Sequence, residues 1–244
     1  MVPNLLNSRR PIGLAFAASI AVVAASIFAG SSAKASTIAS WDFTTNGSGF
    51  ANGTTAGTTA SGVTSAVITR NGGVVVNTAS YSFDSSGFVA NSTAANVQVG
   101  FNTSTAYNVT DLKFSAFSSN SGPGAVDVYA SVNGGAATFV QTLTVTTTSG
   151  TSATNYDITL NDTVNTSLQV YFSAHGTTSA NGGTLSSSGT FRLNNPGDLS
   201  STPFAFIGTA QSSPVPAPPA VPAALAGMLA SGGLALVKRG RRIA

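Results

Sequence analysis

The stretch Leu168-Gln169-Val170-Tyr171-Phe172-Ser173-Ala174 alternates between apolar and more polar side chains. Its even-numbered positions are Leu, Val, Phe and Ala, and its odd-numbered positions are Gln, Tyr and Ser. Because successive side chains of a β-strand point to opposite faces of the sheet, this pattern predicts a strand with one buried and one solvated face. The same alternation recurs at residues 112–116, 126–132 and 156–160.

Turn residues separate the strand candidates along the chain. Asn133-Gly134-Gly135 supplies the positive φ angles of a tight hairpin, so segments 126–132 and 137–145 are expected to pair. The Gly- and Thr-rich segment 46–62 is expected to be a long surface loop. Further strands are expected at residues 38–43, 63–70, 74–77, 95–101, 138–145, 189–194 and 204–208.

The composition of the chain predicts an all-β fold. Thr, Ser, Asn, Gly and Val dominate, and strong helix formers are scarce, with no glutamate anywhere in the chain. Short strands and frequent Gly/Asn turns favour a two-sheet β-sandwich, jelly-roll-like, over residues 36–213. An up-and-down barrel and a β-solenoid are the alternatives, and the absence of a fixed-period repeat counts against the solenoid.

The charge of the chain is concentrated at its ends. The formal net charge is +3, but between Ser36 and Ser213 only Arg70, Lys113 and Arg192 are basic, against all seven acidic residues, which leaves a formal charge of −4. Nucleic-acid binding needs clustered cations and is therefore not expected of this part. The chain has no cysteine, so disulfides and thiolate metal sites are excluded.

The N-terminus has the layout of a secretory signal peptide. Arg9-Arg10 precedes an apolar run over residues 11–28, and Ala33-Lys34-Ala35 provides the small residues of a cleavage site. Residues 1–35 are therefore expected to be removed by the export machinery, leaving Ser36 as the first residue. The arginine pair also leaves a twin-arginine export route open.

The C-terminus combines three segments in a fixed order. Residues 214–219 are rich in proline and form a stiff, extended spacer. Residues 220–237 carry no charge and, at about 1.5 Å per residue, are just long enough for a transmembrane helix. The basic tail over 238–244 is expected to stay in the cytoplasm. Its charged residues are Lys238, Arg239, Arg241 and Arg242.

This C-terminal segment resembles the PEP-CTERM sorting signals of Gram-negative bacteria. Val215, Pro216, Ala217 and Pro218 occupy the position of the family's Pro-Glu-Pro motif, with Ala217 where the family has glutamate. The resemblance implies an exported protein that an exosortase-like enzyme in the membrane cleaves at this motif. A C-terminal membrane anchor that is never processed is the alternative.

The body also resembles a known class of module. Residues 112–115, 126–135 and 188–195 look like the middle and the penultimate strand of secreted jelly-roll modules, which are loosely similar to carbohydrate-binding and lectin-like sandwiches. The resemblance implies the fold and says little about function.

Catalytic and metal sites are sparsely indicated. His175 is the only histidine, and it would need a converging nucleophile and an aspartate to act as a general base. A glycosidase would need two converging aspartates, because glutamate is absent. Neither arrangement is indicated, so no enzyme, catalytic residue or cofactor is expected. A structural calcium ion held by Asp42 or Asp198 with backbone carbonyls remains open.

Three aromatic residues are candidates for sugar stacking. Tyr129 and Tyr171 fall on the predicted wet faces of their strands, and Trp41 lies beside Asp42 in the first strand. Exposed rings of this kind can stack on the apolar faces of sugar rings. Ordinary cross-strand packing of the three rings is the alternative.

These observations predict an exported, surface-sorted, non-enzymatic protein with a structural or adhesive role in the Gram-negative cell envelope or extracellular matrix. A carbohydrate-binding module that contacts extracellular polysaccharide is the alternative, and a hydrolase is the least favoured.

Overall fold

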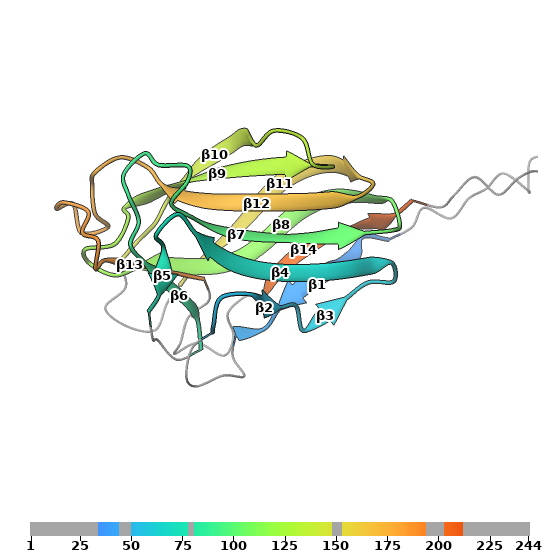
Figure 1. Ribbon diagram of the computed structural model, residues 1–244, viewed down its shortest axis with the longest axis horizontal. Helices are drawn as coiled ribbons and strands as arrows, with labels where there is room; N and C mark the ends of the chain where they lie inside the picture. The colour runs from blue at the N-terminus through green and yellow to red at the C-terminus, as the bar shows by residue number, and fades with distance from the viewer. Residues whose placement is uncertain (1–33, 44–49, 78–80, 148–152, 194–202, 212–244) are drawn as a thin grey trace, which may run out of the picture.

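The computed structural model describes residues 34–43, 50–77, 81–147, 153–193 and 203–211, which fold into two antiparallel sheets of a β-sandwich (Figure 1). Every pairing between the named strands of these residues is antiparallel, and none of the strands is separated by a helix. The all-β prediction is confirmed for this part of the chain.

The six-stranded sheet has the order β10-β9-β12-β7-β4-β2. Its strands are β2 (Thr54–Thr55), β4 (Val63–Asn71), β7 (Asn96–Thr103), β9 (Ala125–Val132), β10 (Thr138–Thr144) and β12 (Ser167–Ala174).

The eight-stranded sheet has the order β3-β1-β14-β8-β13-β6-β5, and β11 also pairs with β8. Its strands are β1 (Ser36–Trp41), β3 (Thr58–Thr59), β5 (Val75–Val76), β6 (Phe83–Ser86), β8 (Tyr107–Ser118), β11 (Thr154–Val164), β13 (Thr190–Leu193) and β14 (Phe204–Ala210).

The predicted hairpin is confirmed as β9 and β10. The two strands pair from Ala130 opposite Thr138 to Ala125 opposite Thr144, with a bulge between Phe139 and Gln141. Asn133 and Gly134 in the turn have φ angles of 54° and 75°. Asn and Gly tolerate this left-handed conformation, which is why the dipeptide marks a hairpin.

The strands differ from the prediction at two places. The segment 46–62 is not a plain surface loop, because its described part contains β2 and β3, which extend one edge of each sheet. The strand β6 was not expected, since its sequence Phe-Asp-Ser-Ser has no apolar alternation. Its first three residues are nevertheless buried, and the ring of Phe83 packs against Phe43 and lies under the guanidinium group of Arg70.

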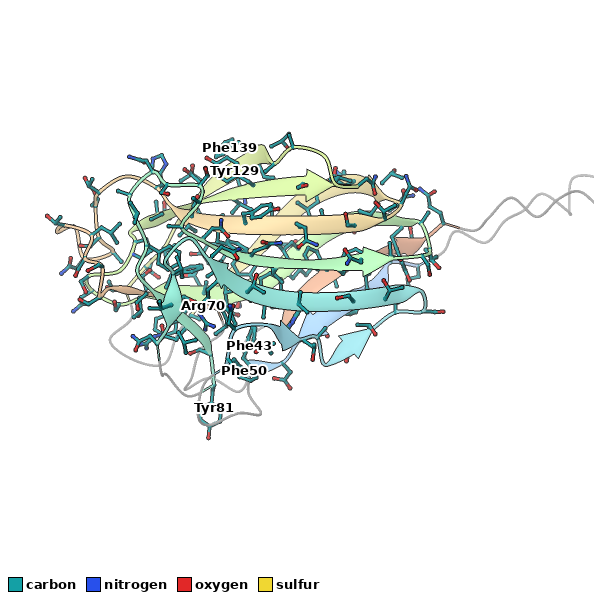
Figure 2. All side chains as sticks on the ribbon, viewed as in Figure 1. Phe43, Phe50, Arg70, Tyr81, Tyr129 and Phe139 are labelled. Atoms are coloured by element: carbon teal, nitrogen blue, oxygen red, sulfur yellow. The ribbon has the colours of Figure 1, made fainter. Side chains whose placement is uncertain are left out.

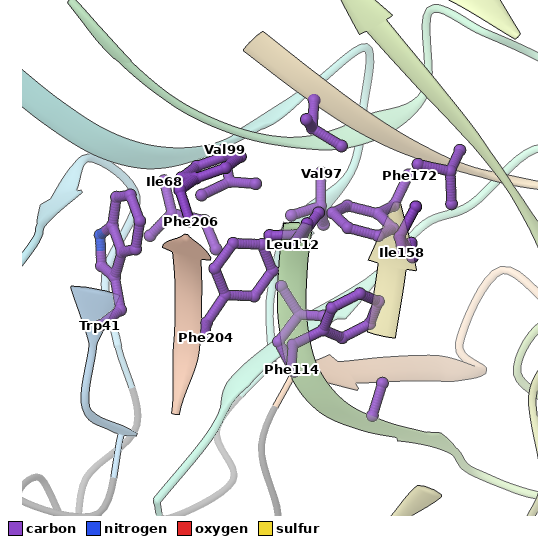
Figure 3. Packing of buried hydrophobic residues seen from close by; sticks show 14 of the residues in the cluster. Trp41, Ile68, Val97, Val99, Leu112, Phe114, Ile158, Phe172, Phe204 and Phe206 are labelled. Atoms are coloured by element: carbon purple, nitrogen blue, oxygen red, sulfur yellow. The ribbon is translucent and has the colours of Figure 1, made fainter. Parts of the chain in front are cut away.

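Aromatic rings fill the space between the two sheets (Figure 3). Phe204 lies at the centre, with its ring centroid 5.7 Å from Trp41, 5.3 Å from Phe114, 6.1 Å from Phe172 and 6.0 Å from Phe206. Full burial of each such ring stabilises the fold by roughly 1.5–3 kcal/mol. This rigid core holds the outer face of the six-stranded sheet in place.

Several predicted segments lie outside the described residues. They include the signal peptide up to Ala33, the spacer 214–219, the transmembrane segment 220–237 and the basic tail 238–244. Across the parts of the chain that the structure describes, no helix has the length and apolar character needed to cross a membrane.

Candidate functional site

The outer face of the six-stranded sheet carries a row of side chains that crosses five strands. Tyr129 on β9 is opposite both Phe139 on β10 and Tyr171 on β12. Tyr171 is opposite Gln98 on β7, which is in turn opposite Thr69 on β4. We call Phe139, Tyr129, Tyr171, Gln98 and Thr69 the aromatic row. Its two ends thus differ, with three rings at the β10 side and polar groups at the β4 side.

The rings of the aromatic row are accessible from solvent. Phe139 is 57% exposed, and Tyr129 and Tyr171 are partly exposed. Phe139 and Tyr129 lie next to each other near the β10 edge (Figure 2), with centroids 5.7 Å apart and ring planes at 71°. A small pocket of about 230 Å³ opens beside Tyr129 and Tyr171 and is also lined by Asn96. Neighbouring apolar rings that solvent reaches on one face can form an interaction site.

Amide side chains continue the face beyond the rings. The Asn71 Nδ2 donates to Gln98 Oε1 at 3.0 Å, and Gln98 Nε2 donates to Gln169 Oε1 at 2.9 Å. Asn71 Nδ2 also donates to Asn96 Oδ1 at 3.0 Å. We call Asn71, Gln98 and Gln169 the amide ladder. Because each amide is held by the next, the ladder presents its remaining polar atoms in fixed directions.

Gly100 makes room for this ladder. It is opposite Gln169 in the register of β7 and β12. A Cβ atom at Gly100 would lie 2.3 Å from Gln169 Oε1 and 2.3 Å from the carbonyl oxygen of Leu168. Only glycine therefore lets Gln169 lie across the sheet towards Gln98.

No protein-family model matches the chain, and no curated protein matches it.

The structure places two of the three candidate aromatic residues side by side on the outer face and buries the third in the core. Tyr129 and Tyr171 are direct cross-strand neighbours on the outer face. Trp41 is only 1% exposed, packs edge-on against Phe204, and donates from Nε1 to the carbonyl oxygen of Thr54 at 3.2 Å. The expectation of an exposed sugar-stacking ring is therefore wrong for Trp41, which belongs to the core.

His175 has an acidic partner that its sequence position did not reveal. His175 Nδ1 lies 3.1 Å from Asp127 Oδ2, and Asp127 Oδ1 accepts a hydrogen bond from Thr142 Oγ1 at 2.6 Å. A surface hollow of about 770 Å³ adjoins His175 and is lined mainly by threonines, serine and glycines of the loops at this end of the sandwich. No hydroxyl of the described residues is hydrogen-bonded to His175.

A buried charge cluster joins the two sheets on the inner side. Arg70 on β4 donates from Nη2 to the carbonyl oxygen of Asp84 at 2.8 Å and from Nε to Ser85 Oγ at 2.9 Å, both on β6 (Arg70 is labelled in Figure 2). Arg192 Nε on β13 lies 3.0 Å from Asp84 Oδ2, close enough for an ion pair but not aligned as a hydrogen bond. The side chain of Asp84 is fully buried. The cluster links β4, β6 and β13, and the carboxylate of Asp84 is too enclosed to contact a ligand.

Burial dominates the protonation of this cluster. It raises the pKa of Asp84 above the usual 3.8, although Arg192 and Arg70 act in the opposite direction. It lowers the pKa of Arg70 to about 10, although the charge of Asp84 raises it. At a pKa of about 10, Arg70 remains protonated at neutral pH.

Among the residues that the structure describes, no three His, Cys, Asp or Glu side chains gather as metal ligands would. Asp42 is exposed at the end of β1, and Asp198 lies outside the described residues. Calcium binding by these two residues stays a prediction.

Proposed function

We propose that this chain is an exported, non-enzymatic β-sandwich that adheres to polysaccharide of the cell envelope or extracellular matrix through the outer face of its six-stranded sheet. The observation that carries the proposal is the juxtaposition of the aromatic row with the amide ladder. Aromatic rings stack on the apolar C–H faces of sugars, and amides exchange hydrogen bonds with sugar hydroxyls. One face of this molecule offers both within neighbouring strands.

The proposed export rests on the ends of the chain. The strand β1 begins at Ser36, directly after the Ala33-Lys34-Ala35 cleavage site, and Ala35 itself is exposed. The last strand, β14, ends at Ala210, just before the proline-rich spacer. These limits support a body that is released as one unit when both ends are processed.

The finer parts of the proposal follow from the resemblances. We assign the sandwich to the jelly-roll-like modules, and the C-terminus to the PEP-CTERM-like sorting signals. An exosortase-like enzyme would then cleave near Pro216 and Pro218, and the basic residues from Lys238 would hold the unprocessed chain in the membrane. The host would be a Gram-negative bacterium.

The binding function is tested with the exported chain and polysaccharide extracted from the matrix of the producing cells. We expect retention of the chain on immobilised polysaccharide, and loss of retention in the variant Tyr171→Ala. The matched control is Tyr81→Ala, because Tyr81 is also an exposed tyrosine but lies outside the face. Equal retention of the Tyr171→Ala variant and the parent would show that the rings serve cross-strand packing only.

A further inference from the structure

We infer that the ligand of the outer face is a single, neutral, linear polysaccharide chain that lies across the strands, along the aromatic row. This inference rests on the proposed function and specifies the chemical class of its ligand. Four properties of the face support this inference: the direction of the row across the strands, the charge, the geometry of the rings and the capacity for hydrogen bonds.

The direction of the ligand follows from the register of the strands. The row from Phe139 to Thr69 spans five neighbouring strands, β10, β9, β12, β7 and β4. At about 4.8 Å per inter-strand step it is roughly 19 Å long. A single sugar would contact only part of this length, whereas a linear chain of several pyranose units can contact rings and amides at the same time.

The charge of the face disfavours a polyanion. The six strands of the sheet contain only two charged residues, Arg70 and Asp127. Arg70 is buried and turned towards β6, so it offers no cation to the outer face. Asp127 faces outward and adds a negative charge beside Tyr129, although it is largely covered and contacts Thr142 and His175. A uronic-acid or sulfated polysaccharide would meet repulsion here without any compensating lysine or arginine.

The geometry of the rings favours one chain over a crystalline surface. The planes of Tyr129 and Phe139 are inclined at 71°, so the rings do not form a flat platform. A flat polysaccharide crystal would need coplanar rings to stack on both. A free chain can turn from one sugar to the next and offer each ring its own apolar face.

The amide ladder is suited to hydroxyl groups. Within the described residues, Asn71 Oδ1 remains an unpaired acceptor and Gln169 Nε2 an unpaired donor, because the other atoms of the ladder bond one another. Sugar hydroxyls donate and accept at once, so a neutral glycan can satisfy both ends. A carboxylate only accepts and would leave Asn71 Oδ1 without a donor.

The test compares three groups of defined polysaccharides by affinity electrophoresis, sedimentation and calorimetry with the exported chain. Xylan, mannan and mixed-linkage glucan are the soluble neutral group, alginate and polygalacturonate are the anionic group, and microcrystalline cellulose is the crystalline probe. We expect a soluble neutral polysaccharide to bind, with longer oligosaccharides binding more tightly than disaccharides. Anionic and crystalline probes should bind at least tenfold more weakly.

Two variants locate the site. Tyr171→Ala removes a ring, and Gln169→Met removes the free amide donor while nearly keeping the length of the side chain. Each should weaken binding of the neutral polysaccharide at least tenfold, whereas Tyr81→Ala should not change it. A thermal unfolding midpoint equal to that of the parent shows that a variant is folded. If Tyr171→Ala does not fold, the effect of Gln169→Met on binding tests the site.

The outcomes separate the two proposals. Preferential, Tyr171-dependent binding of alginate, polygalacturonate or crystalline cellulose would overturn the inference and leave the proposed function standing. Binding that neither variant weakens would overturn the assignment of the face. Binding to none of the three groups would overturn the inference, and the proposed function would fail as well if the chain also ignores polysaccharide from its own matrix.

Discussion

Gly100 shows how a single missing side chain shapes the outer face. A Cβ atom there would lie 2.3 Å from Gln169 Oε1, which a flexible side chain can move, and 2.3 Å from the backbone carbonyl oxygen of Leu168, which cannot move cheaply. We expect Gly100→Ala to lower the free energy of unfolding by about 1–3 kcal/mol, as overpacking does. Urea denaturation measures this value.

The control for Gly100 is Gly57→Ala. A Cβ atom at Gly57 would meet no atom within 4 Å, and its φ angle is not in the left-handed region. Its effect on the free energy of unfolding should stay within about 0.5 kcal/mol. Equal urea midpoints for the Gly57 and Gly100 variants would contradict the close approach of β12 to Gly100.

Phe204 and Phe139 are the same residue type in opposite environments. Phe204 is 1% exposed and touches four other rings, whereas Phe139 is 57% exposed. We expect Phe204→Ala to lower the free energy of unfolding by about 3–5 kcal/mol. Phe139→Ala should change it by less than about 0.5 kcal/mol and should weaken polysaccharide binding. Equal losses of unfolding free energy in the two variants, measured by chemical denaturation, would contradict this difference between a core ring and a surface ring.

At the scale of the elements, β6 and β13 are joined by an ion pair whose carboxylate is buried. Arg192→Met leaves Asp84 in the interior without its nearest cation, so we expect a loss of about 3–5 kcal/mol of unfolding free energy at neutral pH. The control is Lys113→Met, which breaks the exposed pair between Lys113 Nζ and Asp157 Oδ2 at 2.7 Å on β8 and β11. Its stability in urea should be unchanged within error.

The same element has a predictable pH dependence. Burial raises the pKa of Asp84 in the folded state above 3.8, so the folded protein holds this proton more tightly than the unfolded chain. The stabilisation from Asp84 is therefore complete below pH 3.8 and is lost as the pH rises through its folded-state pKa. Asp84→Asn should remove this part of the pH dependence in urea titrations. If the parent instead gained stability relative to Asp84→Asn over this pH range, the direction of the shift would be wrong.

At the scale of the whole molecule, we expect the two ends and the sandwich to have different roles. We expect a chain that ends at Ser213 to be exported but absent from the membrane fraction. The chain of all 244 residues should be found in the membrane or as a shortened extracellular form. Cell fractionation with immunodetection and mass determination of the mature ends measures both. Recovery of the full chain from the cytosol with both ends intact would contradict export.

The sequence predicted those parts of the fold in which neighbouring residues carry the signal. The alternation over Ser167–Ala174 and the Asn133-Gly134 turn both appear in the structure as expected. The strand β6 could not be predicted, because its pairing partner β13 lies more than a hundred residues further along the chain. Trp41 was misjudged for a similar reason, since the rings that bury it include Phe204 and Phe206 on β14.

Only part of the candidate face could be predicted from the sequence. Alternation placed Tyr129 and Tyr171 on wet faces, but their direct pairing depends on the register of β9 and β12. The hydrogen bonds of Gln98 to Asn71 and Gln169 join three strands that are distant in sequence, and no local pattern predicts them. The pairing of Asp127 with His175 likewise depends on the register of β9 and β12, because His175 follows directly after the end of β12.

By itself, the sequence determined that the body forms strands, that its core is aromatic and aliphatic, and that its charged and apolar ends differ from its middle. These properties depend on local periodicity and composition, which a chain carries whatever its tertiary fold. Only the tertiary structure decided which side chains share the outer face, which ring is buried, and which carboxylate lies between two arginines. Strand order and register bring together residues far apart in sequence, and packing between the sheets selects that order over the many pairings that local sequence allows.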